Sequence, residues 1–168
     1  MAKKNKKENE NELEEHEEDL ELDEYQNENS VYLKTHDSIN QELCGEIHKI
    51  ELGYVEVNLK TIQEMVADEM GLIHGGFVFG AADYAAMAAV NERNVVLVAS
   101  ECQFLSPVKL GDTVKVIAKV RHKEGRKRNV EVEAFVLDIK VFSGTFKTVI
   151  TERHVLKLKL LDSAGEKA

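Results

Sequence analysis

Cysteine is scarce in this chain of 168 residues, and that scarcity restricts both its compartment and its chemistry. The two residues, Cys44 and Cys102, show no spacing typical of a metal site or a redox motif. A single pair also does not make the disulfide framework on which small secreted domains depend. We therefore expect two reduced thiols in the core of a cytoplasmic protein, and no metal site.

Long hydrophobic runs are missing as well. The longest apolar stretch, residues 77–90, has fourteen residues and includes Asp83, so it is too short and too polar to cross a bilayer. The lysines of residues 3–7 lead into acids instead of an apolar segment, which argues against a secretory signal. The sequence thus predicts neither a membrane span nor export.

Aromatic residues make up only 6% of the chain, tryptophan is absent, and Pro107 is the only proline. Residues 1–30 hold four lysines and twelve acids, so their net charge of −8 accounts for nearly all of the chain's −9. Such a segment cannot bury enough apolar surface to order itself. We therefore assign residues 1–38 to an acidic, disordered tail, residues 39–160 to one folded domain and residues 161–168 to a flexible C-terminus.

Alternation of apolar and polar residues predicts strands over most of this domain. Two of the runs flank Gly53, and two others flank a turn at Glu124-Gly125. Consecutive strands joined by short turns favour an antiparallel sheet. The alternating runs are residues 44–50, 54–59, 95–105, 114–121, 130–136 and 142–150, the last of them continuing to about Leu158.

One helix is predicted over residues 76–91, with Asn91 and Asn94 suited to ending it. It is apolar on nearly every side, which is typical of a helix buried in a core. We therefore expect an α+β fold in which about six antiparallel strands wrap around this central helix. Because one sheet covers only part of such a helix, we also expect a homodimer, with a dimer of dimers as a further option.

These features resemble the hotdog fold, and in particular the acyl-CoA thioesterases of the phenylacetic-acid type. The motif that carries the resemblance is Gly71-x-x-His74-Gly75-Gly76, followed by an acid, Asp83, nine positions after the histidine. A second block, residues 103–112 (QFLSPVKLGD), resembles their strand–proline–turn segment, and the likeness covers about residues 41–156. It implies acyl-CoA as the substrate or ligand, and no cofactor.

A second likeness points to binding without catalysis. Residues 98–120 and 141–146 resemble the effector domain of the malonyl-CoA-responsive repressor of fatty-acid biosynthesis, a hotdog domain that binds an acyl-CoA. That family has an amide at the position of Asp83 and Arg-Gly at the position of His74-Gly75. The segment before Val31 lacks the helix-turn-helix pattern of the repressor. A non-catalytic acyl-CoA sensor with a protein partner is therefore the alternative to an enzyme. A hotdog dehydratase fits less well, because no proline lies near His74.

Thioester hydrolysis needs an oxyanion donor and a group that attacks the carbonyl or activates water. Backbone N–H groups at a helix start suit a developing negative charge, and the resemblance implies that the Gly75 N–H is the donor. Asp83 would be the base or nucleophile, the alternative being a structural aspartate bonded to backbone across the dimer. His74 could orient the substrate or only satisfy the turn.

The distance between Gly75 and Asp83 along the helix limits how they can act together. Eight helical residues separate Gly75 from Asp83, about 12 Å at 1.5 Å per residue, so both cannot act on one carbonyl from the same helix. Two antiparallel helices across a dimer axis could bring them together. We expect the residues that contact substrate to be Gly76, Phe77, Phe79, Tyr84, Met87 and Ser106.

Two charged segments bear on partners. Leu13, Leu20 and Leu22 could form one stripe of a tail helix that folds only on a protein partner. The basic turn at residues 121–128 could hold coenzyme A phosphates, although a solvated turn is the simpler interpretation. It has no interleaved aromatic residues, so we expect no binding of nucleic acid.

Overall fold

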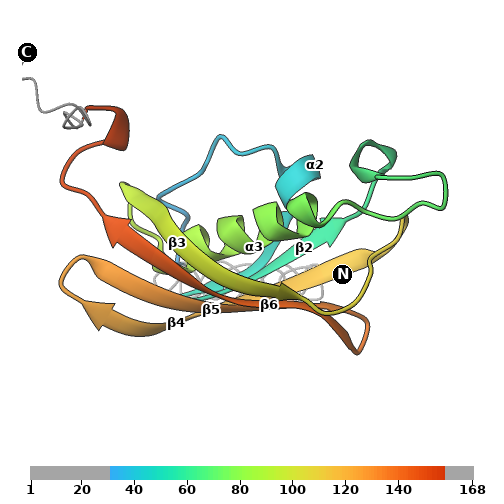
Figure 1. Cartoon of the computed structure of the whole chain (residues 1–168). Helices are drawn as coiled ribbons and strands as arrows, with labels where there is room; N and C mark the ends of the chain where they lie inside the picture. The colour runs from blue at the N-terminus through green and yellow to red at the C-terminus, as the bar shows by residue number, and fades with distance from the viewer. Residues whose placement is uncertain (1–30, 158–168) are drawn as a thin grey trace, which may run out of the picture. The chain divides into compact units, whose positions relative to one another are not determined.

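A six-stranded antiparallel sheet wraps around one long helix in the computed structural model, which describes residues 31–157 (Figure 1). The strand order in the sheet is β1-β2-β4-β5-β6-β3, and every neighbouring pair is antiparallel. The predicted α+β architecture is therefore confirmed. The strands are β1 (Glu46–Glu51), β2 (Tyr54–Lys60), β3 (Val95–Phe104), β4 (Thr113–Glu124), β5 (Lys127–Val136) and β6 (Ile139–Ile150).

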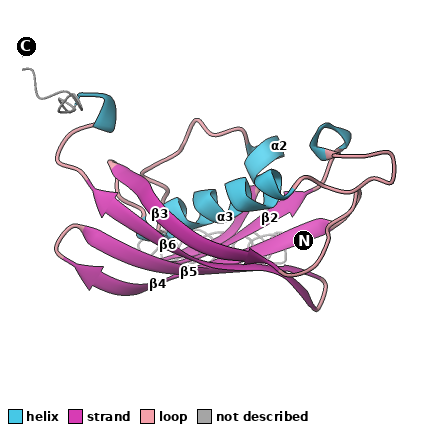
Figure 2. Ribbon diagram, in the orientation of Figure 1, coloured by secondary structure: helices cyan, strands magenta, loops and turns pink. Residues whose placement is uncertain are grey.

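The central helix, α3 (Gly75–Val90), begins and ends within one residue of its predicted limits. Asn91 ends it as expected, in the left-handed region with φ 50°, where asparagine is better tolerated than most residues. The helix contacts all six strands. Figure 2 shows it lying along the concave face of the curved sheet, which explains why a helix without a polar face is stable here.

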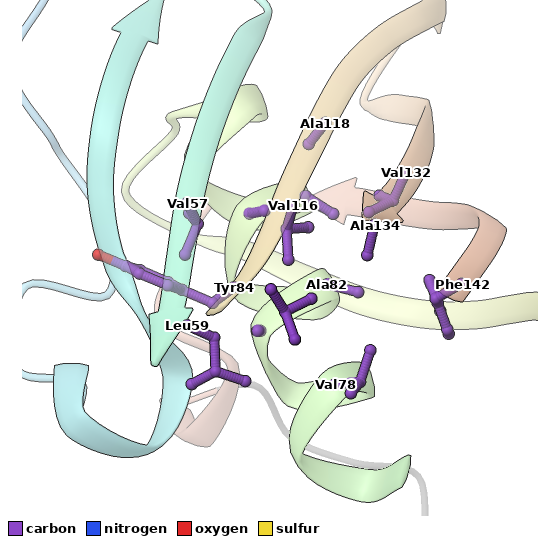
Figure 3. Packing of buried hydrophobic residues seen from close by; sticks show 14 of the residues in the cluster. Val57, Leu59, Val78, Ala82, Tyr84, Val116, Ala118, Val132, Ala134 and Phe142 are labelled. Atoms are coloured by element: carbon purple, nitrogen blue, oxygen red, sulfur yellow. The ribbon is translucent and has the colours of Figure 1, made fainter. Parts of the chain in front are cut away.

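The core forms where α3 meets the inward-facing side chains of the strands (Figure 3). Alternate residues of each central strand are buried, as the period of two predicts. Small helix residues such as Ala82 and Ala85 let the sheet approach closely, and larger ones such as Met87 fill the remaining space. Val57, Leu59, Val116, Ala118, Val132 and Ala134 supply the sheet side of this contact.

Two sequence predictions about the elements were wrong. Cys44 was placed in the first strand, but it is the last residue of a short helix, α2 (Gln41–Cys44). The Asn40 side chain accepts the N–H groups of Glu42 and Leu43, and Gly45 at φ 90° ends the helix before β1 begins. Local capping thus prevailed over the alternating pattern.

The last strand was also predicted too long. Strand β6 ends at Ile150 because its partner β3 begins at Val95, directly opposite. The Thr151 N–H then donates to the Asn94 carbonyl at 3.0 Å, and a 3-10 turn follows at η2 (Val155–Lys157). A strand without a neighbour to pair with cannot continue the ladder.

Residues 33–39 lie against the domain, on the helix side of the sheet. Leu33 and Ile39 pack against the core, Thr35 is buried, and the Lys34 N–H donates to Asn91 Oδ1 at 2.7 Å. The expected tail boundary at residue 38 thus falls inside a segment that contacts the domain. The predictions for residues 1–30 and for residues 161–168, including the leucine stripe, lie outside the described residues.

Candidate functional site

The start of α3 is held in place by the chain on both sides of it. The His74 N–H donates to the Met65 carbonyl at 2.9 Å, next to η1 (Gln63–Met65), and the Ile73 N–H donates to the Val108 carbonyl at 2.8 Å. The helix N-terminus is therefore anchored to the loop that follows β3. A group placed there has a defined position, as a catalytic donor requires.

His74 is the N-cap of α3. Its Nδ1 accepts the Gly76 N–H at 3.0 Å, and its carbonyl accepts the Phe77 N–H at 3.1 Å. Among residues 31–157 the Gly75 N–H has no acceptor. One donor at the positive end of a sixteen-residue helix is thus left for a ligand. Because Nδ1 accepts a hydrogen bond, a neutral His74 carries its proton on Nε2, which is exposed with the ring.

The Gly75 donor lies beside a cavity of about 360 Å³. Phe104, at the end of β3, covers Gly75 so closely that a Cβ there would lie 2.9 Å from its ring carbon Cε1. The same ring stacks edge-on against Phe142 at 5.3 Å, yet Phe104 remains 57% exposed. Gly75 is therefore a glycine because the aromatic ring of Phe104 occupies the place of a side chain. The cavity is lined by Ile73, Gly75, Val78, Phe104, Leu105, Ser106, Pro107, Val108 and Val141.

Asp83 lies two turns further along α3. Its Oδ1 is buried and has no hydrogen-bond partner within residues 31–157. Burial raises the pKa of this carboxyl from 3.8 to about 6. Its neighbour is Cys44 of α2, where burial and the charge of Asp83 both raise the pKa of the thiol. The carboxyl is thus partly desolvated and its buried Oδ1 lacks a partner among residues 31–157, which brings its pKa towards the range of a general base.

Of the other predicted site residues, one lines the cavity and others lie in the core. Ser106 lines the cavity beside Gly75. Tyr84 and Met87 are fully buried in the core, and the Tyr84 hydroxyl has no partner within the described chain. Phe79 packs on Phe146 at 5.5 Å.

Phe77 and Gly76 lie beside the cap. The Phe77 ring meets the His74 ring edge-on at 6.4 Å, and the Gly76 N–H is occupied by that same histidine. Gly75 and Asp83 are not brought together within one chain, because both lie on α3. Sequence reasoning missed Phe104, although it belongs to the Phe-Leu-x-Pro block that carried the resemblance.

The basic turn joins β4 to β5, and all three of its arginines have partners. Arg121 pairs with Glu131 at 2.6 Å, and Arg126 pairs with Glu152. Arg128 donates to the carbonyls of Gly125 and Lys127, both at 2.8 Å. Across residues 31–157 we find no group of three acidic, histidine or cysteine side chains that could hold a metal ion. Nor does that part of the chain contain a helix long and apolar enough to cross a membrane.

Comparison with solved structures identifies close relatives of the whole fold. The protein PH1136 from Pyrococcus horikoshii is 47% identical, with a TM-score of 0.74 over 75% of this chain and 97% of that one. The protein smu.793 from Streptococcus mutans, solved bound to acetyl CoA, is 23% identical, with a TM-score of 0.63 over 71% of this chain and 97% of that one. The second likeness shows the fold alone.

Comparison with curated proteins gives two partial matches. Methylthioribose-1-phosphate isomerase from Aquifex aeolicus is 52% identical over 117 residues, which are 70% of this chain but only 26% of the isomerase. Transcription factor FapR from Thermoanaerobacter sp. is 27% identical over 127 residues, which are 75% of this chain and 64% of FapR. The chain therefore spans about a quarter of the length of the first relative and less than two thirds of the second. We assign the activity of neither relative to this chain.

A family model described as the thioesterase superfamily matches residues 70–143, which run from the loop before Gly75 to the start of the last strand. The match includes the free N–H of Gly75, the cavity beside it and Asp83. The family-model match agrees with the wrapped sheet and with the similarity to the relative from Pyrococcus horikoshii, and together these findings identify the family. The chain belongs to the hotdog-fold thioesterase superfamily.

Proposed function

We propose that this protein is an acyl-CoA thioester hydrolase whose site is shared across a homodimer. The Gly75 N–H of one protomer is the oxyanion donor, and Asp83 of its partner is the base or nucleophile. The observation that carries the proposal is the combination of an unused helix N-terminal donor beside a cavity with a buried, unpaired carboxyl on the same helix. Acyl transfer needs both kinds of group.

The chemistry follows from these two groups. The thioester carbonyl oxygen accepts the Gly75 N–H, which stabilises the negative charge that develops there. The Asp83 carboxylate takes a proton from water while the water oxygen attacks the carbonyl carbon. Collapse of the tetrahedral intermediate breaks the C–S bond, and the Asp83 proton passes to the leaving sulfur. The products are a carboxylic acid and coenzyme A.

Asp83 could instead attack the carbonyl carbon directly. That path expels the coenzyme A thiolate and forms an acyl anhydride, which water then hydrolyses. Labelled water distinguishes the two routes, because a single turnover through the anhydride can leave the label in the Asp83 carboxyl.

The dimer is supported by the edge of the sheet. Strand β3 pairs with β6 on one side only, and its residues 98–101 are exposed. A long, unpaired strand edge with an exposed apolar residue such as Val98, at 58%, offers free backbone groups to another chain. A two-fold axis beside β3 would set two α3 helices antiparallel and place Gly75 of each near Asp83 of the other. We propose the cytoplasm as the setting, where acyl-CoA is available.

The experiment that tests the proposed donor is Gly75→Pro. Proline lacks the N–H, suits the first position of a helix, and follows His74, whose ψ of 127° is compatible with a following proline. We expect acyl-CoA hydrolysis to fall about 10²-fold to 10³-fold, which is the usual cost of one lost oxyanion donor.

The matched control is Gly75→Ala. It adds a Cβ against the same Phe104 ring but keeps the N–H, so it measures the cost of crowding alone. Equal losses of activity in the two variants would contradict the donor role. Retained activity in Gly75→Pro would contradict it as well.

The alternative function is a non-catalytic acyl-CoA sensor, and a match to a transcription factor supports it. The chain matches a transcription factor, FapR, over 75% of its length, and its sequence resembles a repressor family whose effector domain binds an acyl-CoA without cleaving it. Calorimetric binding of acyl-CoA to the wild-type protein, with no release of free thiol, would favour this non-catalytic sensor acting through a protein partner. Thiol release that disappears in Asp83→Ala favours the enzyme.

A further inference from the structure

A second, strongly apolar groove of about 480 Å³ adjoins the cavity at Gly75. The two spaces share Pro107, Val108 and Val141 as lining residues, so they lie side by side. Gly75 lines the first space, and the far end of the second groove lies between Met70 and the β5–β6 turn.

The walls of the second groove are held rigidly. The loop before α3 is joined to the loop before β4 by a bridge between Leu72 and Lys109 and by the Leu110 N–H, which donates to the Gly71 carbonyl at 2.8 Å. The Thr61 hydroxyl donates to the carbonyls of Lys109 and Asp112 at 3.0 and 2.9 Å. Hydrogen bonds within the domain thus fix the walls of the groove, as in most small-molecule sites.

The far end exposes aliphatic side chains, which lowers the stability of the fold relative to polar residues at the same positions. Met70 and Leu137 are each 90% exposed, and Ile139 is 60% exposed. Leu137 also adopts φ 52° in the turn between β5 and β6, where glycine, asparagine or aspartate is usual. A leucine at this position stabilises nothing in the described domain, and strained positions of this kind gather at functional sites.

We propose that this groove takes the alkyl chain of a long-chain aliphatic acyl-CoA, whose thioester carbonyl lies at Gly75. The inference rests on the proposed function of that site. The chemistry favours the alkyl chain over the pantetheine arm, because the amides of the arm need polar partners. The Asp112 carboxylate at the rim already accepts the Lys109 N–H at 3.0 Å, and the far end offers Met70, Leu137 and Ile139 instead.

The test is the affinity for acetyl-, hexanoyl- and lauroyl-CoA with and without Leu137→Asn, measured by calorimetry in the Asp83→Asn background so that no thioester is cleaved. We expect the affinity in that background to rise with chain length, by up to about fourfold for each methylene that the groove buries. Leu137→Asn should weaken lauroyl-CoA binding about fivefold and leave acetyl-CoA binding unchanged. The variant should also melt at a higher temperature, because asparagine tolerates this backbone conformation better.

The matched control is Leu52→Asn, since Leu52 is 85% exposed in the β1–β2 turn and does not line the groove. Affinity that is independent of chain length, or equal behaviour of the two variants, would overturn the inference while the proposed function stands. A change of oligomeric state in Leu137→Asn would overturn it too, since the groove would then be a contact between copies. If no acyl-CoA binds, the proposed function fails first and this inference fails with it.

Discussion

Asp83 lowers the stability of the folded state at neutral pH, because its carboxyl is ionised in a desolvated position. Burial desolvates its carboxyl, whose Oδ1 has no hydrogen-bond partner among residues 31–157, and its pKa is raised to about 6. A raised acid pKa means that the folded state binds a proton more tightly than the unfolded state. The penalty on folding therefore grows as pH rises above 3.8 and is complete above about 6.

Asp83→Asn should separate stability from activity. Removing the ionisable group should stabilise the fold at neutral pH by about 1 to 2 kcal/mol, after allowance for partial exposure and solvent screening. The gain should shrink as pH falls towards about 4, and hydrolysis should be lost at every pH. Thermal melts across pH and a thiol-release assay check both effects, and a variant that is less stable at neutral pH would contradict them. Wild-type kcat/KM should rise with pH through about 6.

At the scale of an element, the N-terminus of α3 combines a capping hydrogen bond with a backbone donor that we propose binds the substrate. His74 accepts the Gly76 N–H, whereas the Gly75 N–H has no acceptor in the described part of the chain. The partial positive charge of the helix end is thus concentrated on one donor at the edge of a cavity. The cap and the proposed oxyanion site are therefore two parts of one local geometry.

His74→Ala and His74→Asn should distinguish capping from catalysis. Alanine removes the acceptor of the Gly76 N–H and should cost about 1 kcal/mol of stability, whereas asparagine can still cap the helix. Chemical denaturation measures this difference. If His74→Asn regains stability but not hydrolysis, the exposed Nε2 acts on the substrate. If it regains both, His74 is a cap, and if neither variant loses stability the cap assignment is wrong.

At the scale of the whole molecule, the length of α3 dictates how many chains a site needs. Gly75 and Asp83 belong to one rigid helix about 12 Å apart, so no side-chain movement brings both to the same carbonyl. In the proposed reaction a second copy supplies the missing group. The proposed dimer is thus a requirement of the chemistry as well as of the exposed β3 edge.

Mixing two inactive variants tests this requirement. A heterodimer of Gly75→Pro and Asp83→Asn has one site with both groups intact, so random exchange of subunits should restore about a quarter of wild-type activity. Each variant mixed with itself is the control. If mixing restores no activity although mass spectrometry detects heterodimers, the site lies within one chain.

Much of this architecture was predictable because its determinants are local. The alternating runs predicted the six strands, and the uninterrupted apolar character of residues 76–91 predicted a buried helix within one residue of its limits. The predictions failed where local capping competed with the pattern, at Cys44, and where a strand lost its partner, after Ile150. Pairing partners distant in sequence decide where a strand ends.

The sequence by itself determined that a wrapped sheet, a central apolar helix and the pair of Gly75 and Asp83 would be present, because period, burial and residue type are properties of short segments. Only the tertiary structure decided which neighbours those residues have. It placed Phe104 over Gly75, Cys44 beside Asp83, and the strained Leu137 in a groove that adjoins the cavity at Gly75. These contacts join residues far apart in the chain, and the packing of the sheet around the helix is what brings them together.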